Sequence, residues 1–176
     1  ERGIEWLPER LVRQLDPARR VAVLSDGSEQ PFDLFLGVPV HRAPAVVAES
    51  GLSVDGWVPV DPQTLQTRFA GVYGVGDVTS VGTPKAGVFA EGQAVIAAAH
   101  IAAALRAGTS SASYDGRGVC YMEFGQHQVA IVDVTFRAGQ APAGTMEGPA
   151  AELAARKIEF GTSRVQRWFG PGSAQS

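Results

Sequence analysis

The first forty residues contain short apolar runs, and one of them alternates loosely with polar positions. Such runs predict β-strands. Asp26-Gly27 lies between two of these runs and is a turn signal that joins them as a hairpin. The run that follows this turn, Phe32–Leu36, is apolar on both faces, which is typical of a strand buried in a layered sheet. The predicted strands are Ile4–Trp6, Arg10–Leu15, Val21–Leu24 and Phe32–Leu36.

The middle of the chain changes to helical spacing. Ala45–Ser50 predicts a short helix that ends at Gly51, and short strands are expected at Trp57–Val60 and Val72–Val75. Gly87–Leu105 is the longest helical pattern and is rich in alanine. His100 interrupts its most apolar part, so we expect no run of the roughly 18 apolar residues that span a bilayer.

Arg106–Gly118 is dense in small residues and predicts a boundary before a C-terminal lobe. This lobe is expected to hold two strands, a loop rich in proline and glycine, and helical segments. In chain order they are the strands Val119–Glu123 and Gln128–Phe136, the loop Ala138–Pro149, and helical segments at Ala150–Phe160 and Arg164–Phe169. The fold class predicted from these elements is α/β.

Composition narrows the functional classes. The 176 residues carry a net charge of −3, which gives no basic field for binding nucleic acid. A single cysteine excludes an intramolecular disulfide and favours a reducing, cytoplasmic compartment. The three histidines are too dispersed along the sequence to indicate a metal site.

Gly74-Val-Gly76-Asp77 follows an apolar run and is the strongest candidate for chemistry. The spacing is close to a phosphate-binding G-x-G-x-x-G, but position 79 is threonine and the Asp77 carboxylate would repel a phosphate. A carboxylate there suits vicinal hydroxyl groups, which donate hydrogen bonds to it. The alternative is an aspartate that caps its own turn.

The segment from Thr64 to Asp77 resembles the second FAD-binding motif of flavoproteins with two dinucleotide-binding domains. By this resemblance Asp77 binds the ribityl chain of FAD and Gly76 allows the backbone to approach it. Residues 83–94 resemble the last flavin contact of that family. A helix that starts at Pro84 or Lys85 would then aim its positive end at the flavin, with backbone contacts from Pro84, Lys85, Ala86 and Gly87. Lys85 could instead be a solvated lysine. Glu91 and Gln93 could face the cofactor or cover the helix surface, and we expect the latter.

Phe32–Pro44 and Gly118–Gly125 resemble segments of sulfide:quinone oxidoreductases and flavocytochrome c sulfide dehydrogenase. The resemblance makes Cys120 a candidate redox thiol, although its partner cysteine is not in this sequence. A lone cysteine in a strand can equally be a small buried apolar residue. A group of aromatic residues could form a quinone slot or belong to the core: Tyr121, Phe124, Phe160, Trp168 and Phe169.

The resemblance implies a C-terminal fragment of a Rossmann-like flavoprotein with a small α+β lobe. Residues 1–40 would belong to an NAD-type domain, 41–107 to the FAD domain and 108–170 to the lobe, with a disordered tail at 171–176. The implied function is an FAD-dependent oxidoreductase that passes electrons from sulfide or a similar donor to a quinone or another acceptor. The alternatives are a flavin reductase similar to type II NADH:quinone oxidoreductases, which uses NAD(P)H, and a non-catalytic interaction domain.

Three further expectations concern the isolated chain and its surroundings. It lacks the G-x-G-x-x-G that holds the ADP half of FAD, so we expect it to bind FAD weakly and to be inactive alone. Strand edges left unpaired could make it a homodimer. Residues 157–169 could touch a membrane peripherally, at its inner face, but their mixed charge predicts weak anchoring.

Overall fold

The computed structural model describes residues 3–170 and divides the chain into two compact units between His41 and Arg42. The predicted disordered tail at 171–176 lies outside the described residues. The first unit is a three-stranded antiparallel sheet of β1 (Val12–Asp16), β2 (Val21–Leu24) and β3 (Glu29–Pro31), in that order. The predicted turn at Asp26-Gly27 is confirmed, and Gly27 adopts a φ of +81° that favours glycine.

Ala22 and Leu24 of β2 form the buried face of this small sheet, and ion pairs tie its turns together. Arg19 donates two hydrogen bonds to the Glu29 carboxylate, at 3.0 and 2.5 Å. The Ser28 hydroxyl donates to Asp26, which holds the pKa of that carboxyl below its usual value. Exposed polar contacts thus connect the turns of this unit around a small apolar face.

Two strands predicted in this unit are wrong. Ile4–Trp6 lies outside any strand, and the strand expected at Phe32–Leu36 is replaced by the earlier β3. Leu34 and Leu36 are 75% and 86% exposed. β3 ends at Pro31, which has no N–H to donate, and no strand of this unit pairs with the residues that follow it.

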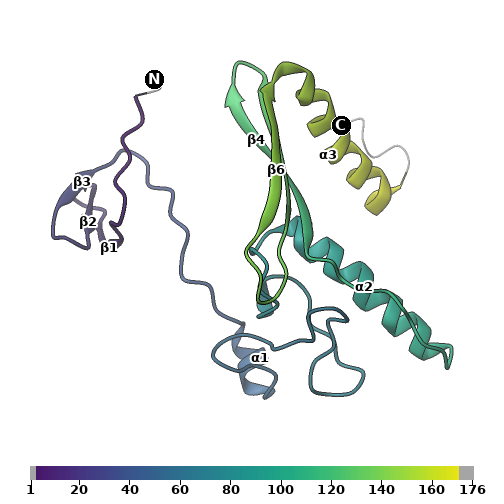
Figure 1. Cartoon of the computed structure of the whole chain (residues 1–176). Helices are drawn as coiled ribbons and strands as arrows, with labels where there is room; N and C mark the ends of the chain where they lie inside the picture. The colour runs from purple at the N-terminus through teal and green to yellow at the C-terminus, as the bar shows by residue number, and fades with distance from the viewer. Residues whose placement is uncertain (1–2, 171–176) are drawn as a thin grey trace. The chain divides into compact units, whose positions relative to one another are not determined.

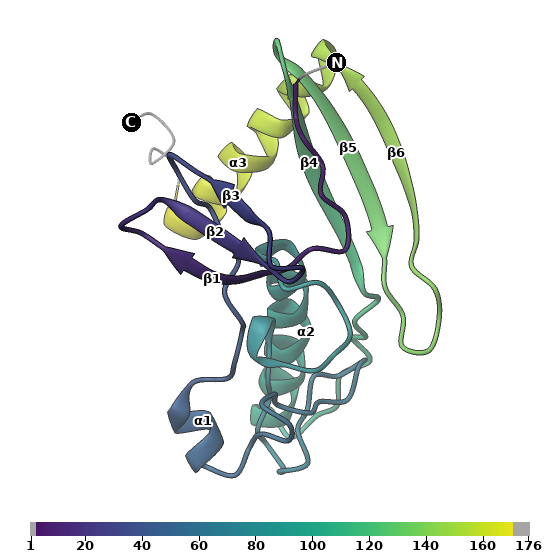
Figure 2. The ribbon, with the colours of Figure 1, turned by 90° about the vertical axis from the view of Figure 1, so that its left-hand side faces the viewer.

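The second unit holds a second three-stranded antiparallel sheet, in the order β4-β5-β6, and three α-helices (Figure 1). Its elements are α1 (Ala45–Glu49), the 3-10 helix η1 (Gly76–Val78), α2 (Gly87–Leu105), β4 (Arg117–Gly125), β5 (Gln128–Thr135), β6 (Ala143–Ala150), the 3-10 helix η2 (Ala151–Leu153) and α3 (Ala154–Phe169). Figure 2 shows β4, β5 and β6 side by side, with α3 alongside the sheet. Leu153, Val129 and Ile131 form the core between them.

Three elements of this unit differ from the sequence prediction. The loop expected at Ala138–Pro149 contains β6, which pairs with β5 from Val129 to Thr135. The two helical segments near the C-terminus are one helix, because Gly161 continues α3 without a break. The strands expected at Trp57–Val60 and Val72–Val75 are reduced to isolated bridges, one of them the parallel bridge between Val58 and Thr79.

Helix α2 has the predicted bounds, and its length and composition would allow it to cross a membrane, contrary to the expectation from the His100 interruption. This is a weak indication, since core helices of soluble proteins meet the same criterion. Within the second unit Phe89, Gln93 and Ala97 form its buried stripe, while Ile101 and Leu105 near its end are exposed.

The fold is mixed α/β, as predicted, but both sheets of residues 3–170 are small and antiparallel. The start of α2 is joined to β4 by a close approach of Phe89 to Gly118. A Cβ atom at position 118 would lie 2.5 Å from the Phe89 ring, which is only 2% exposed and packs edge-on against Phe136. Glycine at 118 is therefore what allows the helix and the sheet to meet.

We predict that Gly118→Ala destabilises the second unit by about 1–3 kcal/mol, because the buried Phe89 ring has no space to move away from the added methyl group. The measurement is chemical denaturation followed by tryptophan fluorescence. Gly161→Ala on α3 is the matched control: open space surrounds position 161, and alanine favours a helix by about 1 kcal/mol over glycine. Equal stability of Gly118→Ala and the wild type would contradict the argument.

Candidate functional site

The turn that carries Asp77 is closed by backbone and side-chain hydrogen bonds that do not involve its carboxylate. Gly76 adopts a φ of +76°, and Thr79 closes η1 by donating from both its backbone N–H and its hydroxyl to the Gly76 carbonyl, at 3.1 and 2.9 Å. The Asp77 side chain is exposed, and no residue between 3 and 170 donates to its carboxylate. This carboxylate is an acceptor for an external donor.

The segment Pro84–Gly87 follows the Asp77 turn after a short loop, and its Lys85 side chain contacts the Asp77 carbonyl oxygen. Helix α2 begins at Gly87 and has Ala86 as its N-cap, so the prediction that the helix starts at Pro84 or Lys85 is wrong. No side chain caps this end, and no described residue accepts a hydrogen bond from the N–H of Gly87 or Val88. These two donors and the helix dipole favour an electron-rich ligand.

The Lys85 side chain makes specific contacts within the protein and is not simply solvated. Its ammonium group donates to the carbonyl oxygens of Asp77 and Thr79, at 2.5 and 3.2 Å. The same group lies 3.6 Å from the centre of the Trp57 ring, in a cation–π contact. Its side chain thus ties the Asp77 turn to the start of α2, and the expectation of a merely solvated lysine is wrong.

Gln93 and Glu91 have specific partners that the sequence reading missed. Gln93 is 1% exposed: its Oε1 accepts from the Gly76 N–H at 2.6 Å, and its Nε2 donates to the Thr83 hydroxyl at 3.1 Å. Glu91 accepts from Arg164 and Arg167 of α3, at 2.8 and 2.9 Å. The spacing of four residues from Phe89 through Gln93 to Ala97 is the signal that could have placed Gln93 on the buried stripe.

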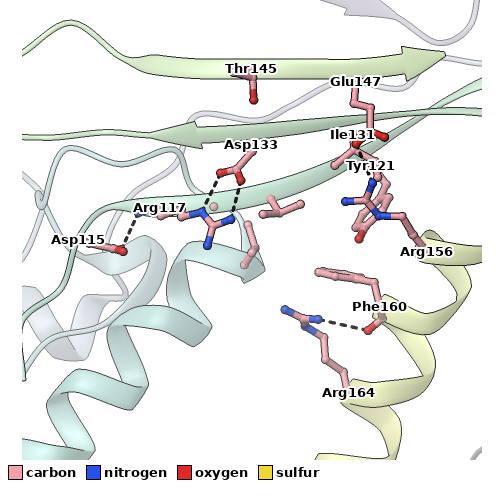
Figure 3. Close-up of a pocket in the computed structure, with 13 residues that line it drawn as sticks. Asp115, Arg117, Tyr121, Ile131, Asp133, Thr145, Glu147, Arg156, Phe160 and Arg164 are labelled. Carbon is pink, nitrogen blue, oxygen red and sulfur yellow. Dashed lines mark hydrogen bonds and ion pairs between the residues drawn. The ribbon is translucent and has the colours of Figure 1, made fainter. Parts of the chain in front are cut away.

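A pocket of about 520 Å³ lies between the start of α2, the sheet and α3 (Figure 3). Its aromatic wall is Tyr121 and Phe160, whose rings are 5.0 Å apart, with the Arg164 guanidinium 3.6 Å from the Phe160 ring centre. Of the five aromatic residues proposed for a quinone slot, only these two line the pocket. Trp168 and Phe169 are exposed near the end of α3, and Phe124 is outside the lining.

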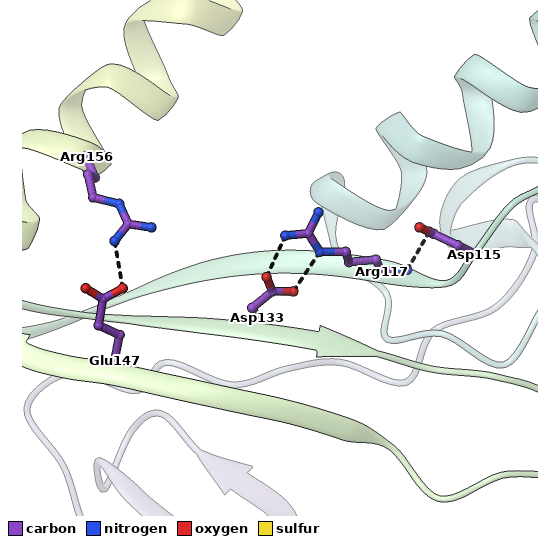
Figure 4. Close-up of polar contacts among 5 residues, drawn as sticks. All are labelled: Asp115, Arg117, Asp133, Glu147 and Arg156. Carbon is purple, nitrogen blue, oxygen red and sulfur yellow. Dashed lines mark hydrogen bonds and ion pairs between the residues drawn. The ribbon is translucent and has the colours of Figure 1, made fainter.

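Two arginines around this pocket form ion pairs, and Asp115 accepts a hydrogen bond from the backbone N–H of Arg117 (Figure 4). Arg117 donates two hydrogen bonds to Asp133, at 2.9 and 2.6 Å, and Arg156 donates to Glu147 at 2.7 Å. The Arg117 hydrogen bond lowers the pKa of the Asp133 carboxyl, and the Asp133 carboxylate raises that of Arg117. Arg164 shares the Glu91 carboxylate with Arg167, while Arg117 and Arg156 each have a carboxylate of their own.

Cys120 and the aromatic wall lie on opposite faces of β4. Successive strand residues alternate between faces, so Val119 and Tyr121 share the face that packs on α3, and Cys120 points to the other. Cys120 is half-buried and does not line the pocket. The structure therefore does not bring the candidate thiol together with Tyr121 and Phe160.

No protein-family model matches the chain. It is 30% identical over 118 residues to the mitochondrial sulfide:quinone oxidoreductase of Schizosaccharomyces pombe, a match that covers 65% of this chain and 26% of the relative. The mitochondrial sulfide:quinone oxidoreductase of Mus musculus is 27% identical over 110 residues, covering 61% and 24%. The chain thus spans about a quarter of the curated relatives it matches. The predicted resemblance to this group is confirmed.

A solved structure also shares the fold. One chain in a cryo-EM structure of the Tetrahymena thermophila mitochondrial ATP synthase superposes with a TM-score of 0.60 over 90% of this chain and 38% of the other. The sequence identity is 18%, so this likeness concerns the fold alone.

The Tyr114 hydroxyl is buried beside Gln93 and Thr83, and no hydrogen bond of good geometry reaches it from the described residues. Burial raises the pKa of Tyr114, while the Gln93 and Thr83 side chains act in the opposite direction. We predict that Tyr114→Phe raises the free energy of unfolding by about 1 kcal/mol, because it removes a buried polar group without a partner. Chemical denaturation measures this change. A loss of stability of the same size would show that the hydroxyl has a partner.

Proposed function

We propose that this chain, which is similar in sequence to sulfide:quinone oxidoreductases, is part of an FAD-dependent oxidoreductase. The observation that carries the proposal is the exposed Asp77 carboxylate on a turn whose backbone is held by hydrogen bonds with Thr79, Gln93 and Lys85. Close to it in sequence, the N–H groups of Gly87 and Val88 have no acceptor among the described residues. Open acceptors and donors at two linked segments fit a ligand that has both hydroxyl groups and electron-rich ring edges.

The residues present fit the middle part of FAD. Asp77 would accept hydrogen bonds from hydroxyl groups of the ribityl chain. The open donors at the start of α2 would face an electron-rich edge of the flavin, where the helix dipole favours negative charge. Lys85 and Gln93 hold these two segments through Asp77, Thr79, Gly76 and Thr83. FAD, when bound, supplies the electron-transfer chemistry.

Sulfide or a similar donor, and a quinone or another acceptor, are the substrates that we propose. The pocket beside Tyr121 and Phe160 supports a flat acceptor of low charge, because its arginines are paired and aromatic rings stack on flat molecules. A role for Cys120 in sulfide oxidation requires a second thiol, and the sequence holds no other cysteine. We place the protein in the cytoplasm, peripheral to the inner face of a membrane.

Asp77→Ala in the full-length protein should weaken FAD binding by roughly 10- to 150-fold, the loss of a charged hydrogen-bond acceptor. Fluorescence titration of the apoprotein with FAD measures the affinity. Asp77→Asn, which keeps one acceptor oxygen, should lose less. Asp55→Asn is the matched control, because Asp55 is also exposed and no described residue pairs with its side chain. Wild-type affinity in Asp77→Ala would refute the proposal.

In the full-length protein, Cys120→Ser should leave FAD affinity unchanged and lower sulfide-dependent reduction of a quinone by at least about 100-fold, since serine cannot replace a redox thiol. Steady-state assays with sulfide and a soluble quinone measure the rate, and titration with FAD is the control. Full activity of Cys120→Ser would assign Cys120 to packing.

A further inference from the structure

We propose that Gln93 is a positioning residue for the cofactor site: its side chain fixes the Asp77 turn relative to the segment that leads into α2. The inference rests on the proposed function and adds a residue that makes no contact with the cofactor. Gln93 comes from the second turn of α2 and reaches both segments from inside the protein, through Gly76 and through Thr83.

The Gln93 amide is buried, so its hydrogen bonds determine whether it is tolerated at this position. It is 1% exposed, on the same stripe as Phe89 and Ala97, where an apolar side chain would be expected. A buried amide without partners is costly, so its place on this stripe depends on the hydrogen bonds that it makes. Those bonds go to Gly76, which directly precedes Asp77, and to Thr83, which directly precedes Pro84.

Gln93 and Lys85 act on the turn from two side chains. Gln93 binds the N–H of Gly76, and Lys85 binds the carbonyl of Asp77, so the backbone of both residues is fixed. The loop between Thr79 and Thr83 has no regular structure and includes the exposed Ser80 and Gly82. Gln93 and Lys85 therefore add side-chain links between the two segments that the loop itself does not supply.

Tyr114 is packed beside the hydrogen bonds that Gln93 makes to Gly76 and Thr83. Its ring packs on α2 at Gly92, where a Cβ atom would lie 3.2 Å from the ring. Its hydroxyl is buried beside Gln93 and Thr83. The amide is thereby shielded from water, which strengthens its hydrogen bonds to Gly76 and Thr83.

The test uses Gln93→Leu in the full-length protein, because leucine keeps the volume and removes both hydrogen bonds. We expect the dissociation constant for FAD to rise roughly tenfold or more, since the N–H of Gly76 loses its acceptor. We also expect the visible absorption of the bound flavin to shift toward that of free FAD. Gln93→Glu should restore part of the affinity, because the protonated carboxyl group that burial favours accepts from Gly76 and donates to the Thr83 hydroxyl.

Two variants control the result. Thr83→Val removes one of the two hydrogen bonds and should weaken FAD binding by about threefold or more. Gln128→Leu, on an exposed position of β5, should change nothing. If Gln93→Leu does not fold, Thr83→Val decides the question, and wild-type affinity in it overturns the inference.

The outcomes separate this inference from the proposed function. Wild-type affinity and spectrum in Gln93→Leu, with affinity lost in Asp77→Ala, overturn the positioning role alone. Wild-type affinity in both variants refutes FAD binding at Asp77 and the positioning role with it. A fall in apoprotein stability in Gln93→Leu without a change in FAD affinity assigns Gln93 to packing, which also overturns the inference.

Discussion

The second unit depends on how the first two turns of α2 pack. Within five residues this segment makes three different connections: Phe89 packs on Gly118 of β4, Glu91 pairs with two arginines of α3, and Gln93 binds Gly76 of η1. The sheet, the C-terminal helix and the Asp77 turn are thus all held by one short stretch of helix. Phe89 and Gln93 are buried, and the Arg164–Glu91 ion pair is partly buried, so solvent screens this ion pair less than a surface pair.

This arrangement relates the two candidate regions of the unit. Val88 lines the pocket beside Tyr121 and Phe160, while Gln93, on the next turn, binds the turn that presents Asp77. A change in α2 would therefore affect both regions. The proposed cofactor site and the pocket beside Tyr121 and Phe160 thus share one helix as support, and a protein contributes to flavin chemistry by positioning the cofactor against its substrate.

Successive side chains of β4 point to opposite faces of the sheet, so neighbours in the sequence are separated in space. Cys120 and Tyr121 are neighbours in the chain, but they point to opposite faces of the sheet. A thiol that reacts with a donor and an aromatic wall that binds an acceptor would thus work from different sides. In the proposed function, donor and acceptor would thus be kept apart, and the sequence itself holds one cysteine.

Local chemistry determined the features that depend on neighbouring residues alone. The sequence was enough to predict the helical pattern of α2, the turn at Asp26-Gly27, the strands β4 and β5 and the motif that ends at Asp77. Tertiary structure decided the rest. Residues 143–150 form β6 only because β5 provides hydrogen-bond partners that outweigh their glycine and proline content, whereas Phe32–Leu36 has no partner strand in its unit. The burial of Gln93 likewise depends on Gly76 and Thr83, two groups that the fold alone brings within reach of its amide.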